Sequence, residues 1–315
     1  MNITFLDSQC LNPGDLTWEG LERLGHFRSY PRTAPEDVVE RAKDSEIIIT
    51  NKVHFGEEEL AQLPNLKCIC VAATGYDCVD VKACRKYGVP VCNCAGYSTE
   101  AVAQHIFALM LESTNHVGRY AQETHDGVWS DCPDFCYCTY PIRELAGQQL
   151  AIVGFGNIGQ AVAKRALAFG MKVAAVTSKA TLPEGVTAIS MEKAFETSDF
   201  VALCLPATPE NKGFVNENLL KNCKPTLTLI NTARGALVND YDVSNALKTN
   251  KLGTYCADVM CPEPPQQNNP LLTAPNCFIT PHVAWAAVEA RQRLLKQLEE
   301  NVEGYLNGNL RNVVN

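Results

Sequence analysis

The sequence has a deficit of positive charge and no long apolar run. It carries 27 lysines and arginines against 35 aspartates and glutamates, which gives its 315 residues a net charge of −8. That balance, with no basic cluster to reverse it locally, argues against a nucleic-acid partner. No apolar run approaches the ~18 residues of a membrane span, and residues 1–7 lack the pattern of a secretion signal. We therefore expect a cytoplasmic protein that binds neither membrane nor nucleic acid.

The cysteines lack the neighbours that a metal site needs. There are fifteen of them, and many lie in apolar strand-like runs, where a reduced cysteine packs as a small apolar side chain. The cluster Cys132, Cys136 and Cys138 has neither a matching C-x-x-C pair nor nearby histidines. Without a secretion signal, a disulfide framework is not expected either. We predict no metal site and leave the role of this cluster open.

Two successive series of strand-like and helical segments fill the chain, in keeping with two domains of about 150 residues each. Strand-like runs of the first series lie at 3–6, 47–50, 68–73 and 89–92. Those of the second lie at 150–153, 172–176, 200–205, 226–231, 254–259 and 277–280. Helical segments such as 34–43 and 79–87 lie between them. Such alternation predicts parallel sheets covered by helices.

Three other segments do not follow this alternation. A long apolar helix is predicted to begin at residue 98 or 99, and His105 within its apolar stripe is expected to be a packed core histidine. Residues 121–141 are irregular and rich in aromatic side chains, which suits an interface arm or a lid. Residues 286–306 predict one amphipathic helix that returns to the first domain.

A glycine motif begins the second series. The run 150–153 leads into Gly154, Gly156 and Gly159 with G-x-G-x-x-G spacing, and a helical pattern follows to residue 170. The first glycine makes the turn, the second lets the backbone approach a pyrophosphate, and the third packs helix on strand. The helix N-terminus, with Asn157 and Ile158, then presents free N–H groups and its positive dipole end to the anion. This arrangement predicts a dinucleotide site.

The acid that usually accompanies this motif is missing. Where an aspartate or glutamate would bind the ribose hydroxyls, eighteen residues beyond Gly159, the chain has Thr177. Such an acid also repels the 2′-phosphate of NADP, so its absence weakens that exclusion. Lys179 is able to attract the phosphate if it points inward, although a lone lysine is more often simply solvated. These residues leave both NAD and NADP open.

Three polar residues follow strands of the second series. Arg234 comes after the run 226–231, Glu263 after 254–259 and His282 after 277–280. Ligands of an open α/β sheet lie beyond the carboxyl ends of its strands, so the fold brings these residues to one rim. Singly, the arginine is equally well explained as a surface residue and the glutamate as a solvated loop acid. Together, behind a dinucleotide motif, they indicate catalysis.

Hydride transfer to a ketone needs these three side-chain types. A histidine supplies the proton for the developing alkoxide at neutral pH. A carboxylate beside it orients the ring and favours its charged form. A guanidinium binds a carboxylate through two parallel hydrogen bonds and polarises the neighbouring carbonyl. We therefore predict His282, Glu263 and Arg234 as the catalytic residues of a dehydrogenase.

The chain resembles the D-isomer-specific 2-hydroxyacid dehydrogenase family over nearly its whole length. The motifs are the glycine motif, NTARG at 231–235, DV at 258–259 leading to Glu263-Pro264, and TPHVA at 280–284. The resemblance implies that Arg234 binds the substrate carboxylate, that Glu263 pairs with His282, and that Asp258 hydrogen-bonds the nicotinamide carboxamide. The remaining cofactor positions that it implies are Thr177, Pro206, Ala207, Thr232, Ala233 and Ala284.

The same resemblance implies a topology. Residues 1–98 and 286–315 would form a discontinuous, flavodoxin-like α/β substrate domain, and a doubly wound Rossmann domain, residues 99–285, would be inserted into it. Backbone N–H groups of Thr74, Gly75 and Tyr76 would hold the side of the substrate carboxylate that Arg234 does not. Without the resemblance, this loop would be an ordinary strand-to-helix turn. The arm around Trp129 resembles the family's dimerisation loop, so a homodimer is expected.

Finer motifs resemble the glycerate dehydrogenase branch, also called hydroxypyruvate reductase. They are ATGY at 73–76, AGYST at 95–99 and HVAWA at 282–286. The branch implies NAD as cofactor, with NADP possible, and reduction of hydroxypyruvate to D-glycerate. The alternatives are reduction of glyoxylate, pyruvate or phosphohydroxypyruvate, and a non-catalytic NAD-sensing protein like the corepressors that share this fold.

Overall fold

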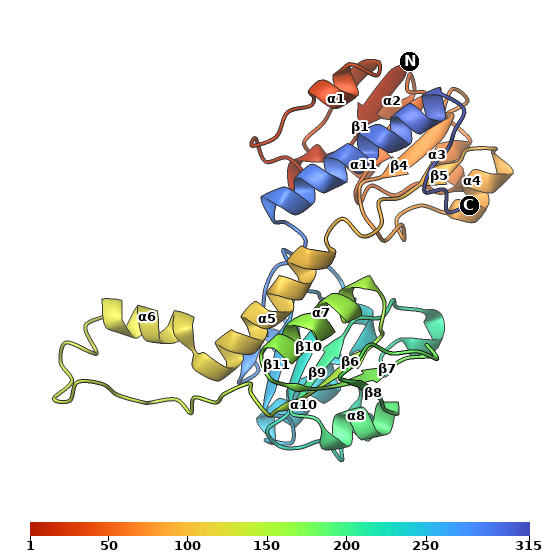
Figure 1. The fold of residues 1–315 in the computed structure, drawn as a ribbon. Coiled ribbons are helices and arrows are strands. Elements are labelled where there is room, and N and C mark those ends of the chain that lie inside the picture. Colours follow the sequence, from red (N-terminus) through yellow and green to blue (C-terminus); the bar gives the residue numbers. More distant parts are fainter. The chain divides into compact units, whose positions relative to one another are not determined.

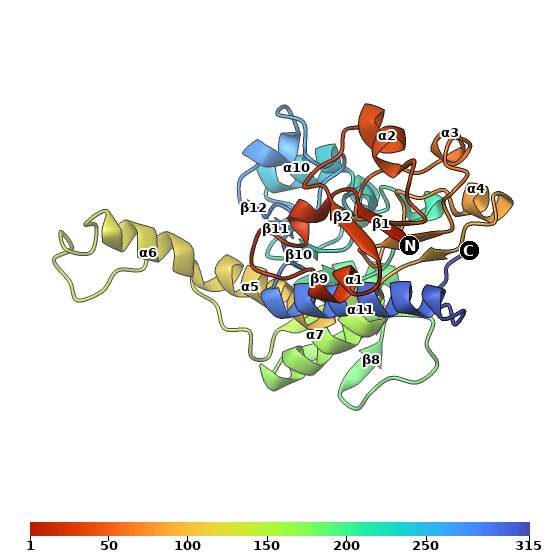
Figure 2. The same cartoon turned by 90° about the horizontal axis from the view of Figure 1, so that it is seen from above.

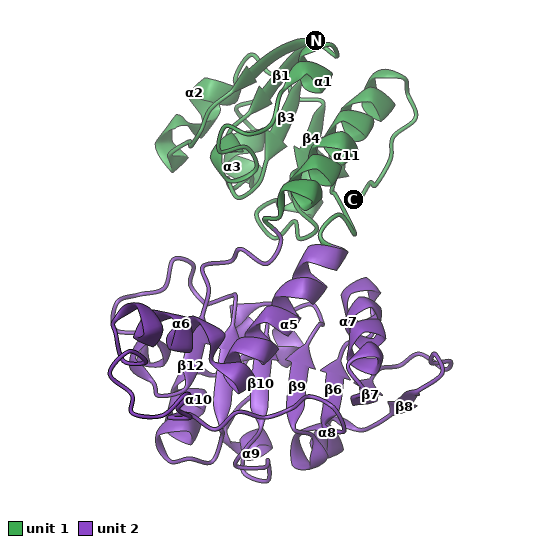
Figure 3. Ribbon diagram, turned by 60° about the vertical axis from the view of Figure 1, so that its left-hand side comes forward, with its two compact units in different colours: residues 1–98, 286–315 green, residues 99–285 purple.

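The computed structural model describes all 315 residues and divides into two compact units (Figure 3). Unit 1 contains residues 1–98 and 286–315, and unit 2 contains residues 99–285. Unit 2 is thus inserted into the sequence of unit 1, and each unit has its own parallel sheet. The predicted fold class, a doubly wound sheet inserted into a second α/β unit, is confirmed. No helix has both the length and the apolar character needed to cross a bilayer.

Unit 1 is a five-stranded parallel sheet in the order β2-β1-β3-β4-β5, which is the flavodoxin-like order. Its strands are β1 (Asn2–Phe5), β2 (His26–Ser29), β3 (Ile47–Thr50), β4 (Cys68–Val71) and β5 (Val91–Cys92). Its helices are α1 (Glu19–Glu22), α2 (Val38–Ala42), α3 (Glu57–Leu60), α4 (Val81–Lys86) and α11 (Val288–Leu306). The central strands β3 and β4 are buried throughout, because helices cover both of their faces.

Helix α11 carries the end of the chain back to unit 1 (Figure 1), where it packs against β4 and α1. Its buried side, with Leu294, Leu298 and Val302, recurs at helical spacing, as the pattern of 286–306 predicted. The buried amide of Asn301 donates to the carbonyl of Asn93 at 2.9 Å and so ties the helix to the end of β5. Burial raises the pKa of the neighbouring Cys94 thiol, which therefore remains a protonated, apolar side chain.

The buried Arg291 of α11 forms a two-pronged ion pair with Asp15, and both N···O distances are 2.6 Å. This guanidinium holds the pKa of Asp15 below its usual range. A lowered carboxyl pKa stabilises the fold above the unfolded value of ~4 and loses that contribution as the pH falls through the folded value. Asp15→Asn should therefore lower the Tm at neutral pH, and the difference from wild type should shrink in acid. Calorimetry across pH 3–8 measures this; a constant difference would contradict it.

Unit 2 is a seven-stranded parallel sheet in the order β12-β11-β10-β9-β6-β7-β8. Its strands are β6 (Gln149–Val153), β7 (Lys172–Val176), β8 (Val186–Ala188), β9 (Phe200–Leu203), β10 (Thr228–Asn231), β11 (Thr254–Ala257) and β12 (Cys277–Ile279). The chain starts at the central β6, runs outward to β8, and then resumes at β9 on the other side of β6. That reversal is the doubly wound arrangement, which places ligands beyond the carboxyl ends of β6 and β9.

Helices cover both faces of this sheet. They are α5 (Thr99–Asn115), α7 (Asn157–Ala168), α8 (Met191–Thr197), α9 (Glu217–Leu220) and α10 (Asp240–Lys248). Helices α5 and α7 share one apolar core with the sheet, and α8, α9 and α10 share the core on the other face. The apolar stripe predicted from residue 99 is therefore the face with which α5 packs on the sheet.

Three local predictions were wrong or incomplete. The edge strands β2 and β8 were not anticipated, because β2 is polar and half solvated and β8 is only three residues long, so neither shows a continuous buried run. The helix expected over 34–43 is a 3₁₀ turn at Pro35–Asp37, followed by α2. The segment predicted as irregular from residue 121 begins inside a helix, α6 (Val117–His125). Helix α6 buries none of its residues and is polar overall, so it lacks the broad apolar stripe by which α5 was predicted.

Helix α6 and the chain up to about residue 141 form an arm that projects away from the rest of unit 2 (Figures 1 and 2). The carboxylate of Glu123 accepts hydrogen bonds from the hydroxyls of Tyr137 and Tyr140, at 3.1 and 2.6 Å. The Arg119 guanidinium lies 3.7 Å from the centre of the Tyr140 ring. The arm therefore has an internal polar framework that holds its loop against α6.

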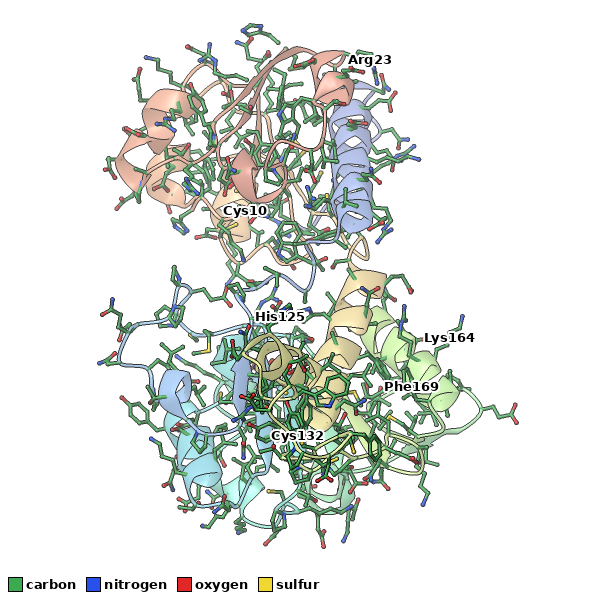
Figure 4. The ribbon with its side chains drawn as sticks, turned by 90° about the vertical axis from the view of Figure 1, so that its left-hand side faces the viewer. Cys10, Arg23, His125, Cys132, Lys164 and Phe169 are labelled. Atoms are coloured by element: carbon green, nitrogen blue, oxygen red, sulfur yellow. The ribbon has the colours of Figure 1, made fainter.

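The tip of the arm exposes apolar side chains. Trp129 is 51% exposed and Phe135 is 89% exposed. His125 at the end of α6 and Cys132 in the following loop mark this region in Figure 4. The Cys132 thiol donates only a weak hydrogen bond, 3.9 Å long, to the Cys136 carbonyl, and no group of three His, Cys, Asp or Glu side chains in the structure is arranged to hold a metal.

Candidate active site

The glycine motif forms the turn between β6 and α7. Gly154 has a φ of +93°, which side-chain-bearing residues rarely adopt, and a Cβ there would lie 2.6 Å from the Cys204 carbonyl oxygen. A Cβ on Gly159 would lie 2.3 Å from the carbonyl oxygen of Gly154. Glycine at position 154 lets the turn lie against the end of β9, and glycine at position 159 lets α7 lie against the turn. A side chain at either position would prevent that contact.

The N-terminus of α7 fits a pyrophosphate. Gly156 is the N-cap, no side chain caps the helix, and a Cβ on Gly156 would meet no atom within 4 Å. The N–H groups of Asn157, Ile158 and Gly159 point out of the first turn, since the first intrahelical bond runs from Gln160 N to Gly156 O. Uncapped N–H groups beside open space at the positive end of a helix dipole form an anion site.

The other predicted cofactor residues follow neighbouring strands. Thr177 comes directly after β7, Pro206 and Ala207 follow β9, and Thr232 and Ala233 follow β10. The Thr177 hydroxyl accepts a hydrogen bond from the Lys179 N–H at 3.1 Å, so it braces its own turn. Lys179 is exposed and takes part in no ion pair. The structure thus has no carboxylate at the position that distinguishes NAD from NADP.

His282 and Glu263 lie together beyond the ends of β12 and β11. The His282 Nδ1 is 2.7 Å from Glu263 Oε2, and the other carboxylate oxygen accepts the Met260 N–H at 2.9 Å. Because a carboxylate only accepts, Nδ1 carries a proton, and Nε2 is left to face a ligand. Both side chains are about one-third exposed, at 31% and 34%. This pair is able to hold and deliver a proton.

Arg234 lies beyond the end of β10, and a buried side chain shapes its loop. The Asn231 amide donates to the Arg234 carbonyl at 2.9 Å and accepts the Ala233 N–H at 3.1 Å. Asn231 is fully buried. Its role was missed in the sequence, although a polar residue ending an apolar strand was a usable signal. Arg234 donates from Nη1 to the Ala233 carbonyl at 2.8 Å.

Gly235 joins the arginine loop to the glutamate loop. A Cβ on Gly235 would lie 2.1 Å from the Met260 carbonyl carbon and 2.6 Å from the Cys261 nitrogen. The backbones therefore touch at a point that only glycine allows. Arg234 and Glu263 are each within two residues of this contact, on the loops that follow the hydrogen-bonded neighbours β10 and β11. The strand order β12-β11-β10 accordingly brings the histidine, glutamate and arginine to one edge of unit 2.

Asp258 is buried beside the histidine and is only 1% exposed. Its Oδ1 accepts the Thr280 hydroxyl at 2.6 Å and the Val283 N–H at 2.9 Å. Its Oδ2 accepts the Ala284 N–H at 2.8 Å. All three donors belong to the turn that carries His282. Asp258 therefore holds this turn in place, in addition to the cofactor contact that the resemblance implies.

The predicted substrate loop lies in unit 1, after β4. The backbone N–H groups of Thr74, Gly75 and Tyr76 donate to no acceptor in the protein. The loop is fixed by side-chain bonds, from the Thr74 hydroxyl to the Cys94 carbonyl at 3.0 Å and from the Asn93 amide to the Thr74 carbonyl at 2.8 Å. It is thus a braced loop with free donors, as a carboxylate site requires.

Comparison with known proteins identifies the family. Residues 107–284 match the model of the D-isomer specific 2-hydroxyacid dehydrogenase, NAD binding domain. The chain is 41% identical to the hydroxypyruvate reductase of Blautia hydrogenotrophica, with 100% of each chain covered. It is 39% identical to the glycerate dehydrogenase of Methylorubrum extorquens, with 99% of this chain and 98% of that protein covered. The chain therefore belongs to the D-isomer-specific 2-hydroxyacid dehydrogenase family.

A solved structure extends the comparison. An acyclic imino acid reductase in complex with NADPH and D-Arg superposes with a TM-score of 0.88 at 27% sequence identity, with 100% of each chain covered. The family match is to an NAD binding domain, and unit 2 provides the uncapped helix and open glycine that such a cofactor needs. The cofactor of this oxidoreductase is therefore a nicotinamide dinucleotide. The similarity of the chain to a glycerate dehydrogenase and a hydroxypyruvate reductase confirms the branch that its motifs predicted.

Proposed function

We propose that the protein reduces hydroxypyruvate to D-glycerate, with NADH as the preferred reductant. The observation that carries this proposal is the 2.7 Å pair of His282 and Glu263 next to the Arg234 loop, which supplies a proton donor and a carboxylate receptor. The similarity to a hydroxypyruvate reductase and a glycerate dehydrogenase supports the choice of substrate. Reduction of glyoxylate, pyruvate or phosphohydroxypyruvate uses the same chemistry and is the alternative.

Each unit has its own role in this proposal. Unit 2 is the dinucleotide-binding domain, in which the first turn of α7 binds the pyrophosphate. Asp258 and Ala284 with Thr232 and Ala233 bind the nicotinamide end, and Thr177, Pro206 and Ala207 bind the adenosine side. Unit 1 is the substrate domain, and the free N–H groups of Thr74, Gly75 and Tyr76 are proposed to bind the substrate carboxylate.

The chain's own residues manage the proton and the substrate charge. When bound, the reduced nicotinamide cofactor would supply the hydride for this reduction. Nε2 of His282 gives its proton to the carbonyl oxygen as negative charge develops there. Glu263 orients the ring through Nδ1 and stabilises the charged imidazolium before transfer. Arg234 fixes the carboxylate through two parallel hydrogen bonds, which also aligns the adjacent carbonyl.

A matrix of four keto acids and two cofactors tests the proposal. Purified protein should oxidise NADH with hydroxypyruvate at a higher kcat/KM than with glyoxylate, pyruvate or phosphohydroxypyruvate. If kcat/KM were roughly tenfold higher for another keto acid, about 1.4 kcal/mol in transition-state binding, that keto acid would be the assigned substrate instead of hydroxypyruvate. Absence of turnover with all four, despite NADH binding, would instead favour a dinucleotide-sensing protein.

Restoring an acid at position 177 should restrict the cofactor. In Thr177→Asp, a carboxylate would face the 2′-phosphate of NADPH, and like-charge juxtaposition disfavours binding. We expect kcat/KM for NADPH to fall by about tenfold or more, while the value for NADH stays level or rises. Thr177→Asn is the matched control, since it has the same shape without the charge. Equal behaviour of the two variants would contradict the electrostatic explanation.

We propose further that two copies associate through the arm. Its exposed Trp129 and Phe135, held on a frame bonded through Glu123, are suited to bury apolar area against a second copy. Sedimentation velocity should give a dimer for wild type and a shift towards monomer for Trp129→Ser/Phe135→Ser. Tyr241→Ser, which alters a 74% exposed side chain outside the arm, is the control. A monomeric wild type would overturn this proposal.

The proposed compartment is the cytoplasm. All fifteen cysteines are free thiols in the structure, and such a set persists in a reducing environment. Expression of a tagged full-length chain, followed by cell fractionation, tests this location. Recovery with an oxidising compartment would contradict it.

A further inference from the structure

A partly buried polar relay connects α5 to the turn that carries the catalytic histidine. His105, on α5, places its Nε2 2.9 Å from the Thr280 hydroxyl. That hydroxyl is 2.6 Å from Asp258 Oδ1. His105 Nε2 is itself 3.5 Å from the same carboxylate oxygen. Three elements, α5 and the ends of β11 and β12, thus meet in one chain of hydrogen bonds.

The direction of each hydrogen bond in the relay is fixed. The Thr280 hydroxyl has one proton and two acceptors within reach, Asp258 Oδ1 at 2.6 Å and the Ala257 carbonyl at 3.3 Å, and it donates to the nearer and charged one. His105 Nε2 must then donate to the lone pair of Thr280, because the hydroxyl has no second proton to offer. The N–H of His105 Nε2 therefore orients the Thr280 hydroxyl, so that this hydroxyl points its proton at Asp258 Oδ1. The hydrogen bond to Asp258 thus depends on the one from His105.

The turn beyond Asp258 requires such support. His282 has a φ of +55°, in the left-handed region that residues other than glycine seldom adopt. Such a conformation persists only where the surroundings hold it. Here the holders are Asp258, through the N–H groups of Val283 and Ala284, and the Thr280 carbonyl, which accepts the His282 N–H at 3.0 Å. The strained residue is the proposed proton donor itself.

We propose that His105 and Thr280 are positioning residues for catalysis, which act through Asp258 to hold His282 in its left-handed conformation against Glu263. The proposal rests on the proposed function, because it concerns the residue that delivers the proton. His105 is thereby more than a packed core histidine. It is 20% exposed on its side chain, contacts no reacting atom in this proposal, and is separated from Thr280 by 175 residues of chain.

Thr280→Val removes the hydroxyl at nearly constant shape. We expect kcat to fall by about tenfold, since Asp258 loses a charge-assisted donor and the turn loses its support. The Kd for NADH should change by less than about threefold, which is below ~0.7 kcal/mol. Thr280→Ser should regain most of kcat because it returns the hydroxyl. His105→Phe should lower kcat, and His105→Gln, which keeps an N–H donor, should retain more of it.

The chain offers a matched control for this substitution. Thr228 on β10 is fully buried in the same sheet, and its hydroxyl has no hydrogen-bond partner. Thr228→Val therefore makes the same chemical change where no relay exists, and kcat should remain at the wild-type value. A loss in Thr280→Val that Thr228→Val does not share cannot come from removing a buried hydroxyl in general.

Two further readouts separate positioning from general damage. The double variant Thr280→Val/His105→Phe should lose no more kcat than Thr280→Val alone, because both changes interrupt one relay. In ¹⁵N-histidine-labelled protein without cofactor, the His282 ring signals, assigned by their loss in His282→Ala, should move away from the Nδ1-protonated pattern in Thr280→Val. This second measurement detects the turn without any turnover.

The possible outcomes are distinct. Full kcat in Thr280→Val, equal losses in Thr280→Val and Thr280→Ser, or losses that multiply in the double variant would each overturn the proposal. Unchanged His282 ring signals in Thr280→Val would do so as well. If the wild-type protein reduces none of the keto acids, the proposed function fails instead, and the ring signals still decide whether the relay holds the His282 turn.

Discussion

His282→Ala should reduce kcat for the keto acid by about 10²–10⁴-fold, the usual range for loss of a general acid. The reason is local: Nε2 is the atom of the His282–Glu263 pair that is left to donate, and no other histidine lies on the turns after β10, β11 and β12. Binding of NADH should be unaffected, because the anion site belongs to α7. Steady-state kinetics and fluorescence titration with NADH measure the two effects separately.

The control for this experiment is His125→Ala, at the exposed end of α6, which should leave kcat unchanged. Glu263→Gln should fall between wild type and His282→Ala, since a neutral amide still contacts the ring but stabilises its charged form less. If His282→Ala kept more than about a tenth of wild-type kcat, His282 would not be the proton donor, because loss of a general acid has a larger effect.

The two parallel sheets could be predicted because most of their inner strands are buried on both faces. Such strands appear in the sequence as short continuous apolar runs, as in β3 or β9. The β6–α7 turn could be predicted for a different reason: close backbone contacts at Gly154 and Gly159 exclude other residue types, so the glycines mark the turn in the sequence. The strands β2 and β8 and the helix α6 escaped prediction because little or none of their surface is buried.

The site residues that could be predicted from the sequence are those whose place in the fold follows from their position after a strand. Arg234, Glu263 and His282 each come after a strand, and because neighbouring parallel strands end at the same edge of a sheet, these residues lie at that edge together. The relay through His105 has no such signature, because α5 crosses the sheet from a distant part of the sequence. Asn231 was visible as a motif member, but its brace on Arg234 depends on a bend of the loop that spacing does not reveal.

Arg234→Gln should lower kcat/KM for the keto acid by about 10²–10⁴-fold. A guanidinium holds a carboxylate through two charge-assisted hydrogen bonds, each contributing ~1.5–3 kcal/mol, and glutamine offers one neutral donor. Arg234→Lys should lose less, because the charge remains while the two-pronged geometry is lost. The effect should appear mainly as a raised KM. Steady-state kinetics over a wide range of keto acid concentration measures it.

The carboxylate contact can be isolated by changing the substrate instead of the enzyme. Dihydroxyacetone replaces the carboxylate of hydroxypyruvate by a hydroxymethyl group, so it has nothing for Arg234 to bind. Wild type should strongly prefer hydroxypyruvate, and Arg234→Gln should lose most of that preference while its slow reaction with dihydroxyacetone stays the same. Arg23→Gln, on the exposed end of α1 (Figure 4), should leave both rates unchanged. If Arg234→Gln kept the wild-type preference, the carboxylate would have to be bound elsewhere, and the free N–H groups of Thr74, Gly75 and Tyr76 would then carry that interaction alone.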